Sequence, residues 1–267
     1  TIGITAPLLF TTLKKINGSK KIIIEKHVKL LNSKGPDASS SLDIIKFSEM
    51  ISNIRIISKA KKLIKECKKA GADAVKFQMW RASDLYDSSH PNWKEIKKSE
   101  ITFEKAKKLK KFADQEGIEF FCSAFYPEAI DILEKLKVKK YKIASRTCLL
   151  KDPFSLETLI LKAQTKKSVI ISMGMGGDKQ KIKNIFKNNN TTFCYCVSKY
   201  PTKFNEINWK KAINYNGFSD HTIGITAPLL FTTLKKINGS KKIIIEKHVK
   251  LLNSKGPDAS SSLDIIK

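Results

Sequence analysis

Apolar residues follow two alternating periods from about residue 58 onward. Residues 60–67 place apolar side chains at the i, i+3, i+4, i+7 spacing of an amphipathic helix, and Gly71 ends this stripe. The residues that follow, 73–78, form a short and largely apolar run that is typical of a strand. The same succession returns as a predicted helix over 103–112, a stop at Gly117 and a predicted strand over 118–125. The chain therefore repeats a helix and strand step.

Five further strands are predicted downstream, with helices or short connecting segments between them. They lie at 141–145, 168–173, 191–198, 217–220 and 243–248, and a helix over 227–237 precedes the last. Strands that alternate with helices pair in parallel, and near-continuous apolar strands are buried on both faces. The pattern predicts an α/β protein, and 267 residues suit a single (β/α)8 barrel, or TIM barrel. The seven strands are one short of a closed barrel.

The two ends of the chain carry the same sequence. Residues 1–46 recur without a difference as residues 222–267, so the period is 221 residues. Structural repeats drift in sequence, whereas an identical terminal block indicates a permuted or wrapped reading frame; an assembly artefact and a recent tandem duplication stay open. We expect residues 47–267 to form the barrel domain. We further expect residues 21–27 to supply the missing strand, followed by a helix over 47–57.

The charge of the chain raises the question of a nucleic-acid or membrane partner. The formal net charge is +26, yet Arg55, Arg81 and Arg146 are the only arginines among 51 basic residues. Nucleic-acid recognition commonly uses arginine, and the lysines here lie mostly on polar faces of predicted helices. No apolar run approaches the roughly 20 residues of a membrane-spanning helix. We therefore expect a soluble protein with small-molecule substrates and neither nucleic-acid nor membrane partners.

The five cysteines form no CxxC pair. Their odd number, without a secretory leader, predicts reduced thiols in a cytoplasmic protein. Cys194 and Cys196 project from one face of a predicted strand, which could suit a metal, but small buried core thiols are the more common case. We interpret both as core residues.

Polar side chains gather at the C-terminal ends of five predicted strands, where the active site of a parallel barrel forms. Lysines and hydroxyls there can bind a phosphate or carboxylate, and two imidazoles on adjacent strands can bind a divalent metal. Each residue also has a structural interpretation, such as an interior salt bridge for Lys76 or a hydrogen-bonded turn for His221. The residues are Lys76, Gln78, Lys142, Ser145, Ser198, Tyr200, Ser219, His221, Glu246 and His248.

Five segments of the chain stand out together: GADAVKFQ, YKIAS, CVSKYPT, GFSDHTIGI, and IEKHVKL with its trailing GPD. In order and spacing they resemble the signature segments of the sialic acid (N-acetylneuraminate) synthase family, which includes legionaminate and pseudaminate synthases. The resemblance covers residues 58–267. It implies a transferase of carbohydrate biosynthesis, which condenses phosphoenolpyruvate with an N-acetylated hexose-type aldehyde to give a nonulosonic acid and phosphate.

The resemblance also implies roles for single residues. His221 and His248 look like the ligands of a divalent metal, Mn2+ or Mg2+, that polarises the sugar aldehyde. The phosphoenolpyruvate contacts would be Lys76, Lys142, Ser145 and Ser219, and the sugar contacts Gln78, Ser198, Tyr200 and Asp258.

The repeat duplicates part of this site, because His27 and Asp37 copy His248 and Asp258. Only one copy can occupy the proper position in the barrel. His248 follows the GFSDH strand directly, so a right-handed crossover predicts that it lies beside His221. We therefore expect the second copy to form the site.

Three departures from the family pattern bear on activity. Arg146 and Thr147 stand where neuraminate-making members carry an acidic sugar-binding residue, and Ser198 stands where they have an asparagine. The family's first strand is not found. Its C-terminal antifreeze-like domain, which reaches across a homodimer, is not found either. A catalytically silent barrel fragment that binds sugar phosphate or a partner chain is the alternative.

Overall fold

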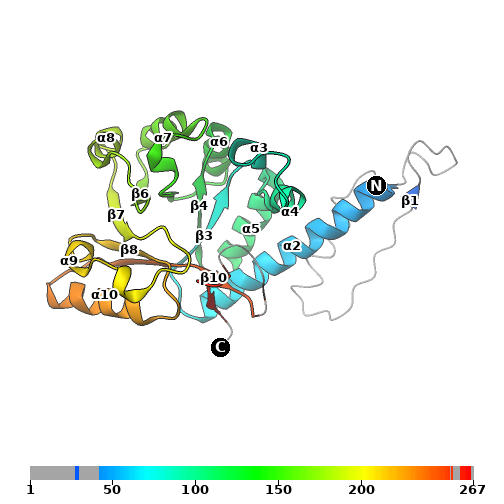
Figure 1. The fold of residues 1–267 in the computed structure, drawn as a ribbon. Helices are drawn as coiled ribbons and strands as arrows, with labels where there is room; N and C mark the ends of the chain where they lie inside the picture. Colours follow the sequence, from blue (N-terminus) through cyan, green and yellow to red (C-terminus); the bar gives the residue numbers. More distant parts are fainter. Residues whose placement is uncertain (1–27, 30–41, 253, 255–258, 266–267) are drawn as a thin grey trace.

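A seven-stranded parallel sheet forms the body of the protein in the computed structural model, which describes residues 28–29, 42–252, 254 and 259–265. The strands pair in the order of the sequence, from β3 at one edge to β9 at the other (Figure 1). The predicted number and order of these strands are confirmed. Their bounds are β3 Ala74–Met79, β4 Glu119–Ala124, β5 Lys140–Ile143, β6 Ser168–Ser172, β7 Thr191–Cys196, β8 Gly217–Asp220 and β9 Ile244–Lys247.

Helices connect successive strands and cover the outer face of the sheet. Local sequence explains several starts: the Thr102 side chain caps α5 and Asp178 caps α8, each by accepting from a backbone N–H. No helix within the described residues is long and apolar enough to cross a bilayer. The helices are α2 Ile44–Lys69, α3 Ala82–Leu85, α4 Trp93–Ser99, α5 Phe103–Gln115, α6 Pro127–Lys135, α7 Ser155–Gln164, α8 Lys179–Ile185, α9 Trp209–Ala212 and α10 Thr226–Ile237, with short 3-10 turns η1 Thr147–Leu149 and η2 Phe204–Glu206.

The sheet curls into a half-barrel of the TIM-barrel type. Its curvature is fixed by a contact between the two edge strands, because Lys76 Nζ on β3 lies 2.6 Å from Glu246 Oε1 on β9. These strands are at opposite ends of the pairing order, so only a curled sheet can bring them together. The polar side chains meet inside the curve.

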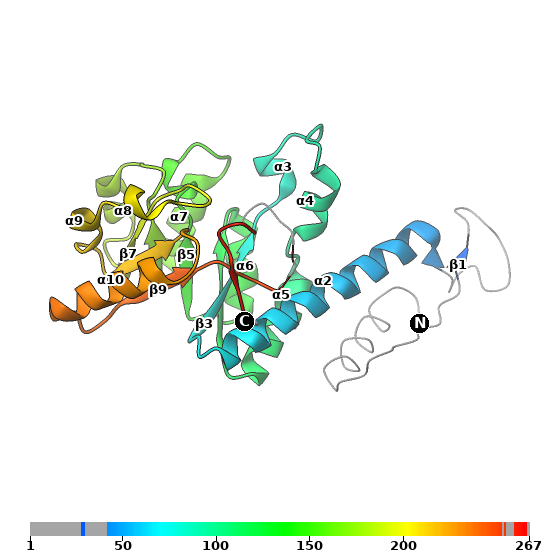
Figure 2. The same ribbon diagram turned by 60° about the horizontal axis from the view of Figure 1, so that its bottom comes forward.

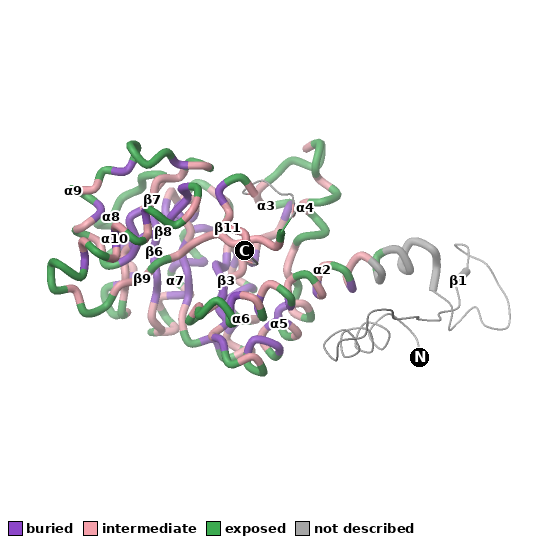
Figure 3. Tube along the Cα trace, turned by 90° about the horizontal axis from the view of Figure 1, so that it is seen from below, coloured by how far each residue is buried: buried purple, intermediate pink, exposed green. Residues whose placement is uncertain are grey.

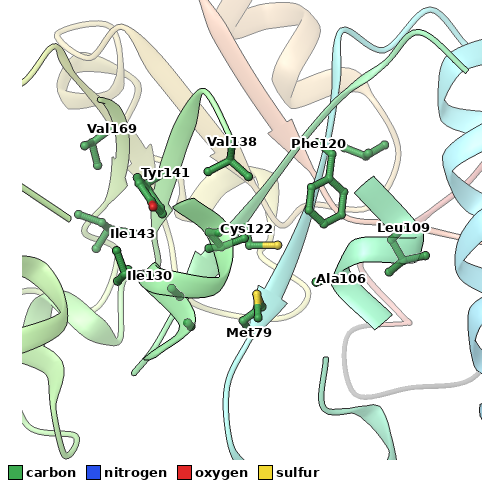
Figure 4. Close-up of a cluster of buried hydrophobic side chains, with 14 of the residues drawn as sticks. Met79, Ala106, Leu109, Phe120, Cys122, Ile130, Val138, Tyr141, Ile143 and Val169 are labelled. Atoms are coloured by element: carbon green, nitrogen blue, oxygen red, sulfur yellow. The ribbon is translucent and has the colours of Figure 1, made fainter. Parts of the chain in front are cut away.

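Most of the apolar core lies where the outer helices pack against the middle of the sheet. The strands run through the buried centre, whereas the outward surfaces of the helices are exposed (Figure 3). The predicted burial of the strands on both faces is confirmed for β4 and β6, which are buried at every residue except the first. Figure 4 shows this cluster, whose members include Met79, Leu109, Phe120, Ile130, Tyr141, Ile143 and Val169.

Helix α2 is longer than the sequence pattern predicted. Two helices were expected, one over 47–57 and one from residue 60, but a single helix of 26 residues spans both. The reason is that the buried stripe begins earlier, with Ile54 and Ile57, and continues without a break to Ile64 and Cys67. The first half of α2 projects from the body, and its second half packs beside α5 and β3 (Figure 2).

The two copies of the repeated sequence form the same local pairing. In the first copy β1 (Val28–Lys29) pairs in parallel with β2 (Leu42–Asp43). In the second copy β10 (Val249–Lys250) pairs with β11 (Leu263–Asp264) in the equivalent register. The expected closing strand, residues 21–27, lies outside the described residues. The strand that occupies the position beside β8 comes from the second copy, as expected.

Lys162 is a cation placed within the core, and it yields a first prediction. The side chain is fully buried, and its Nζ donates to the Ala124 carbonyl at 2.7 Å. Burial lowers the pKa of Lys162 from 10.5 to about 7. Because the folded pKa is the lower one, this lysine destabilises the fold at pH 7, and the penalty disappears as the pH rises toward 10.5.

We expect Lys162→Met to raise the free energy of unfolding at pH 7 by roughly 2 to 4 kcal/mol, after allowing for the lost hydrogen bond. Urea unfolding at pH 7 and pH 10 would measure the gain, which should shrink at the higher pH. Lys135→Met, at an exposed position, serves as the control and should change little. A variant less stable than the parent at pH 7 would show that the hydrogen bond of Lys162 stabilises the fold by more than the burial of its charge destabilises it.

Candidate active site

Three charged side chains meet inside the half-barrel. Lys142 on β5 is buried, and its Nζ lies 3.3 Å from Glu246 Oε2, while Lys76 contacts the other oxygen of the same carboxylate at 2.6 Å. Burial by itself would raise the pKa of Glu246, but Lys142 and Lys76 outweigh it and hold that pKa well below its usual range. Two cations and one anion leave the group with one excess positive charge, so it favours an anionic ligand.

Hydroxyl groups surround the lysines. Ser172, at the end of β6, accepts a hydrogen bond from Lys142 Nζ at 2.7 Å, and the buried Ser219 adds to the lowering of the pKa of Glu246. Ser145 follows β5 and accepts from the backbone N–H of Gly174 at 2.9 Å. Of these, Ser145 and Ser219 were predicted from the sequence. Ser172 was missed, although the rule that strand ends carry the site would have found it.

The two predicted metal ligands lie side by side. The rings of His221 and His248 have centroids 5.2 Å apart, as expected for residues that follow the paired strands β8 and β9. His221 Nδ1 lies 2.6 Å from the Val197 carbonyl. A carbonyl oxygen can only accept, so Nδ1 carries a hydrogen, and Nε2 is the ring nitrogen left for a ligand in the neutral imidazole. This arrangement orients a ligating imidazole in many metal sites.

These residues fit a divalent metal held by two imidazoles and by oxygens from water or substrate. Two strands fix the rings, and the Val197 carbonyl sets the tautomer of His221. Within the described residues, no group of three or more His, Cys, Asp or Glu side chains converges on one point. The predicted sugar contact Asp258 lies outside the described residues.

Tyr200 and Ser198 border the histidines. The Tyr200 ring is 42% exposed and packs against both imidazoles, at 4.1 Å from His221 and 5.6 Å from His248 between centroids. Ser198 lies beside Cys196, with its Oγ 3.9 Å from the thiol sulfur. Tyr200 therefore packs directly on the histidine pair, whereas Ser198 is linked to His221 only through Cys196.

Cys196 was interpreted as a core residue, and the structure corrects this. Cys194 is buried among apolar side chains, but the thiol of Cys196 faces the site, 3.8 Å from Ser145 Oγ and 3.9 Å from His221 Nδ1. Alternation along β7 cannot separate the two, because both project to the same face. The two differ in their position along the strand, since Cys196 is the last residue of β7, at the end that carries the site. All five cysteines are free thiols, as expected.

Glycine at position 174 lets the loop after β6 approach Cys196 and Ser198 closely. A Cβ there would lie 2.6 Å from Ser198 Oγ and 2.8 Å from Cys196 Sγ, closer than real Cβ atoms come. Any larger residue would push the loop outward and remove the hydrogen bond that Ser145 accepts from the backbone N–H at this position. The sequence did not single out this glycine.

A pair of charges holds the loop that carries His221. Asp220 is buried and accepts from the Thr222 backbone N–H at 2.9 Å, while Lys247 Nζ reaches Asp220 Oδ2 at 2.7 Å. Lys247 also donates to the Thr222 carbonyl. These bonds connect β8 with β9 directly below the histidines, so they fix the spacing of the two imidazoles.

Arg146 has a different environment from the one its position in the motif suggested. Its guanidinium forms a bidentate ion pair with Asp152, with contacts between 2.7 and 2.9 Å. This hydrogen bond with Asp152 raises the pKa of Arg146. Arg146 therefore anchors the loop after β5. At the position where neuraminate-making members carry an acidic sugar contact, this chain has an arginine that is paired with Asp152.

A cavity of about 760 Å³ gives access to the charged group. Its lining includes Lys76, Gln78, Lys142, Glu246 and His248, together with the length of β3 and β9. A volume of this size is within the range of small-molecule sites. Of the predicted site residues, Lys76, Gln78, Lys142 and His248 line this cavity.

Comparison with known proteins places this geometry in a family. A model described as the NeuB family matches residues 63–266. An uncharacterized protein of Methanocaldococcus jannaschii is 34% identical over 218 residues, which cover 76% of this chain and 61% of the relative. The N,N'-diacetyllegionaminic acid synthase of Campylobacter jejuni is 30% identical over 234 residues, which cover 77% of this chain and 67% of that enzyme.

A solved structure agrees with the sequence relatives. The N-acetylneuraminic acid (sialic acid) synthetase of Leptospira borgpetersenii, crystallised with citrate, superposes with a TM-score of 0.68 at 26% identity, over 78% of this chain and 74% of the synthetase. The chain spans about 61% of the length of the archaeal relative and 67% of the Campylobacter enzyme. The family match includes every site residue described above, from Lys76 to His248. The chain belongs to the NeuB family.

Proposed function

We propose that this half-barrel catalyses the condensation of phosphoenolpyruvate with an N-acetylated hexose-type aldehyde, giving a nonulosonic acid and phosphate. The observation that carries the proposal is the meeting of Lys76, Lys142 and Glu246 in one cavity, which His248 also lines with the His221 ring beside it. Relatives named as sialic acid and legionaminic acid synthases support the same reaction class. In this reaction C3 of phosphoenolpyruvate attacks the aldehyde carbon, water adds at C2, and phosphate leaves.

The group of Lys76, Lys142 and Glu246 would bind phosphoenolpyruvate. Lys76 and Lys142 would bind the phosphate and the carboxylate of phosphoenolpyruvate, because both groups are anionic and the three side chains together carry one excess positive charge. Glu246 bridges the two ammonium groups and holds them in place before the substrate arrives. Ser145 and Ser219 would donate hydrogen bonds to the same oxygens. Preorganised donors of this kind stabilise charge that develops as phosphate leaves.

The histidine pair would hold a divalent ion, Mn2+ or Mg2+, through His221 Nε2 and a ring nitrogen of His248. When bound, such an ion supplies Lewis acidity to a carbonyl oxygen. The protein's own contribution is to fix the imidazoles: Val197 sets the tautomer of His221, and the Asp220–Lys247 pair sets the distance between strands.

The acceptor sugar would bind on the rim. Tyr200 presents an exposed ring next to the histidines, Ser198 presents a hydroxyl beside Cys196, and Gln78 lines the cavity from β3. Asp258, the remaining proposed sugar contact, lies outside the described residues. Since Arg146 is held by Asp152, we propose that the acceptor differs from that of neuraminate-making members, which use an acidic residue at this position.

The open half-barrel favours a second candidate, in which the chain binds sugar phosphate or a partner without turnover. Among the described residues the sheet has seven strands and two unpaired edges, so the cavity is open on one side. An open side admits water, and closed sites owe part of their catalytic power to excluding it.

One assay separates the two candidates. The chain is incubated with phosphoenolpyruvate, Mn2+ and N-acetylmannosamine or bacillosamine-derived sugars, and released phosphate is measured. We expect acceptor-dependent release, reduced at least about 100-fold by His221→Ala or His248→Ala, which also lose Mn2+ binding in calorimetry. His90→Ala, outside the cavity, is the matched control and should be unaffected. Binding of Mn2+ and phosphoenolpyruvate with no release for any acceptor would favour the silent fragment.

A further inference from the structure

Lys162 is a buried cation that the proposed reaction does not yet use. It belongs to α7, which lies beside α6 on the outer face of the sheet (Figure 1), and its side chain is fully buried. Among the described residues its Nζ has two acceptors, both of them backbone carbonyls, and no carboxylate partner. Because burial of this charge destabilises the fold at pH 7, a contribution to stability does not account for the side chain.

The two acceptors lie on neighbouring strands, at the end of the sheet that carries the site. The carbonyl of Ala124, the last residue of β4, accepts from Lys162 Nζ at 2.7 Å, and the Lys142 carbonyl on β5 accepts at 3.5 Å. The pairing of β4 with β5 is the shortest in the seven-stranded sheet, a single residue pair of Ser123 with Lys142. Lys162 therefore adds a bridge where the backbone ladder between neighbouring strands is shortest.

The bridge ends on the backbone of a lysine that belongs to the candidate active site. The side chain of Lys142 is held inside the half-barrel, where its Nζ donates to Ser172 Oγ at 2.7 Å and to the Ile143 carbonyl at 3.0 Å. These contacts, with Glu246 at 3.3 Å, orient the ammonium only while the backbone of β5 stays in place. Lys162 acts on that backbone from the outer face of the sheet and does not line the cavity. It can therefore affect a ligand in the cavity only through Lys142.

We propose that Lys162 is a positioning residue of this site, which fixes the backbone of Lys142 from behind the sheet so that the Lys142 ammonium is placed to bind phosphoenolpyruvate. The inference rests on the proposed function, since it concerns the same substrate. A shift of about 1 Å in a binding group can lower a rate by about 100-fold. Loss of the bridge should therefore weaken the binding of phosphoenolpyruvate, although no group that touches it has been changed.

Substrate binding by Lys162→Met is the first test. Methionine keeps an apolar side chain of similar length but removes both hydrogen bonds. We expect the Kd for phosphoenolpyruvate, measured by calorimetry without acceptor, and the KM for phosphoenolpyruvate to rise about tenfold. The KM for the acceptor should change by less than about twofold. The same variant is expected to be more stable than the parent in urea at pH 7, so partial unfolding cannot explain the weaker binding.

Lys235→Met is the matched control. Lys235 is also a buried lysine on an outer helix, α10, and its Nζ donates to the Ile213 carbonyl at 3.1 Å. Its second acceptor is Asn216, which directly precedes β8 at the end of the sheet opposite the site. The control therefore loses the same kind of buried hydrogen bond without touching β5. We expect it to bind phosphoenolpyruvate as the parent does.

Hydrogen exchange is the second test, and it needs neither substrate nor turnover. Peptides that cover residues 140–145 should exchange at least about tenfold faster in Lys162→Met than in the parent, and should be unaffected in Lys235→Met. Unchanged exchange over these residues, or an unchanged Kd for phosphoenolpyruvate, would overturn the inference, as would an equal loss of binding in Lys235→Met. A parent chain that binds phosphoenolpyruvate but releases no phosphate contradicts the proposed function alone, and the comparison of Kd values then decides the role of Lys162.

Discussion

Replacing Lys142 by methionine is expected to lower kcat/KM for phosphoenolpyruvate by about 10²- to 10³-fold. Lys142 is only 3% exposed, and its Nζ is held by Ser172 Oγ and Glu246. Methionine keeps the length of the side chain. The remaining Lys76–Glu246 pair is neutral, so the fold should persist and the loss should be one of binding and catalysis.

Steady-state phosphate release, with unfolding monitored in parallel, checks this expectation. Lys140→Met is a matched control, since Lys140 is on the same strand but at its other end, where it pairs with Glu119 at 2.8 Å. We expect the control to retain full activity. A Lys142→Met enzyme within tenfold of the parent would show that this lysine does not hold phosphoenolpyruvate.

Replacing Glu246 by alanine is expected to have the largest effect on stability, a loss of roughly 3 to 5 kcal/mol at pH 7. The change leaves Lys76 and Lys142 together without a counter-charge inside the half-barrel. The pKa of Glu246 lies well below 4.5 in the folded state, so its contribution is present above that pH and is lost as the pH falls through the folded pKa. The gap between parent and variant should therefore narrow in strong acid.

Urea unfolding at pH 7 and at low pH measures this gap. Adding Lys142→Met to Glu246→Ala should restore part of the stability, because it removes one of the two unpaired cations. Glu104→Ala, at an exposed helix position, is the control and should cost less than about 1 kcal/mol. If Glu246→Ala lowers the free energy of unfolding no more than this control, other groups neutralise the charges of the two lysines.

The elements around the site could be predicted because their signals are local. Short apolar runs between helical periods specified seven strands, and Gly71 and Gly117 marked the ends of helices. The adjacency of His221 and His248 was also predictable, since successive strands of a parallel sheet are neighbours. Ser172 obeys the same strand-end rule and could have been found with it.

Other features depend on contacts that no local pattern contains. The ion pair between Lys76 and Glu246 joins residues at opposite edges of the sheet, so it exists only because the sheet curls. The orientation of Cys196 toward His221 depends on where β7 ends relative to β8. Arg146 could not be assigned to Asp152 by sequence, because a guanidinium pairs with whichever carboxylate the loop brings near.

The sequence by itself determined the order of helices and strands, the parallel arrangement and the identity of the two terminal copies, because periodicity and repetition are properties of the chain alone. The tertiary structure decided which copy lies beside β8 and how the curl of the sheet brings Lys76, Lys142 and Glu246 together. It also decided that, among the described residues, β3 and β9 are the edge strands of the sheet. Two identical segments have identical local preferences. Local preferences alone therefore cannot say which copy pairs with β8; the connection of the second copy to β8 through α10 places it there.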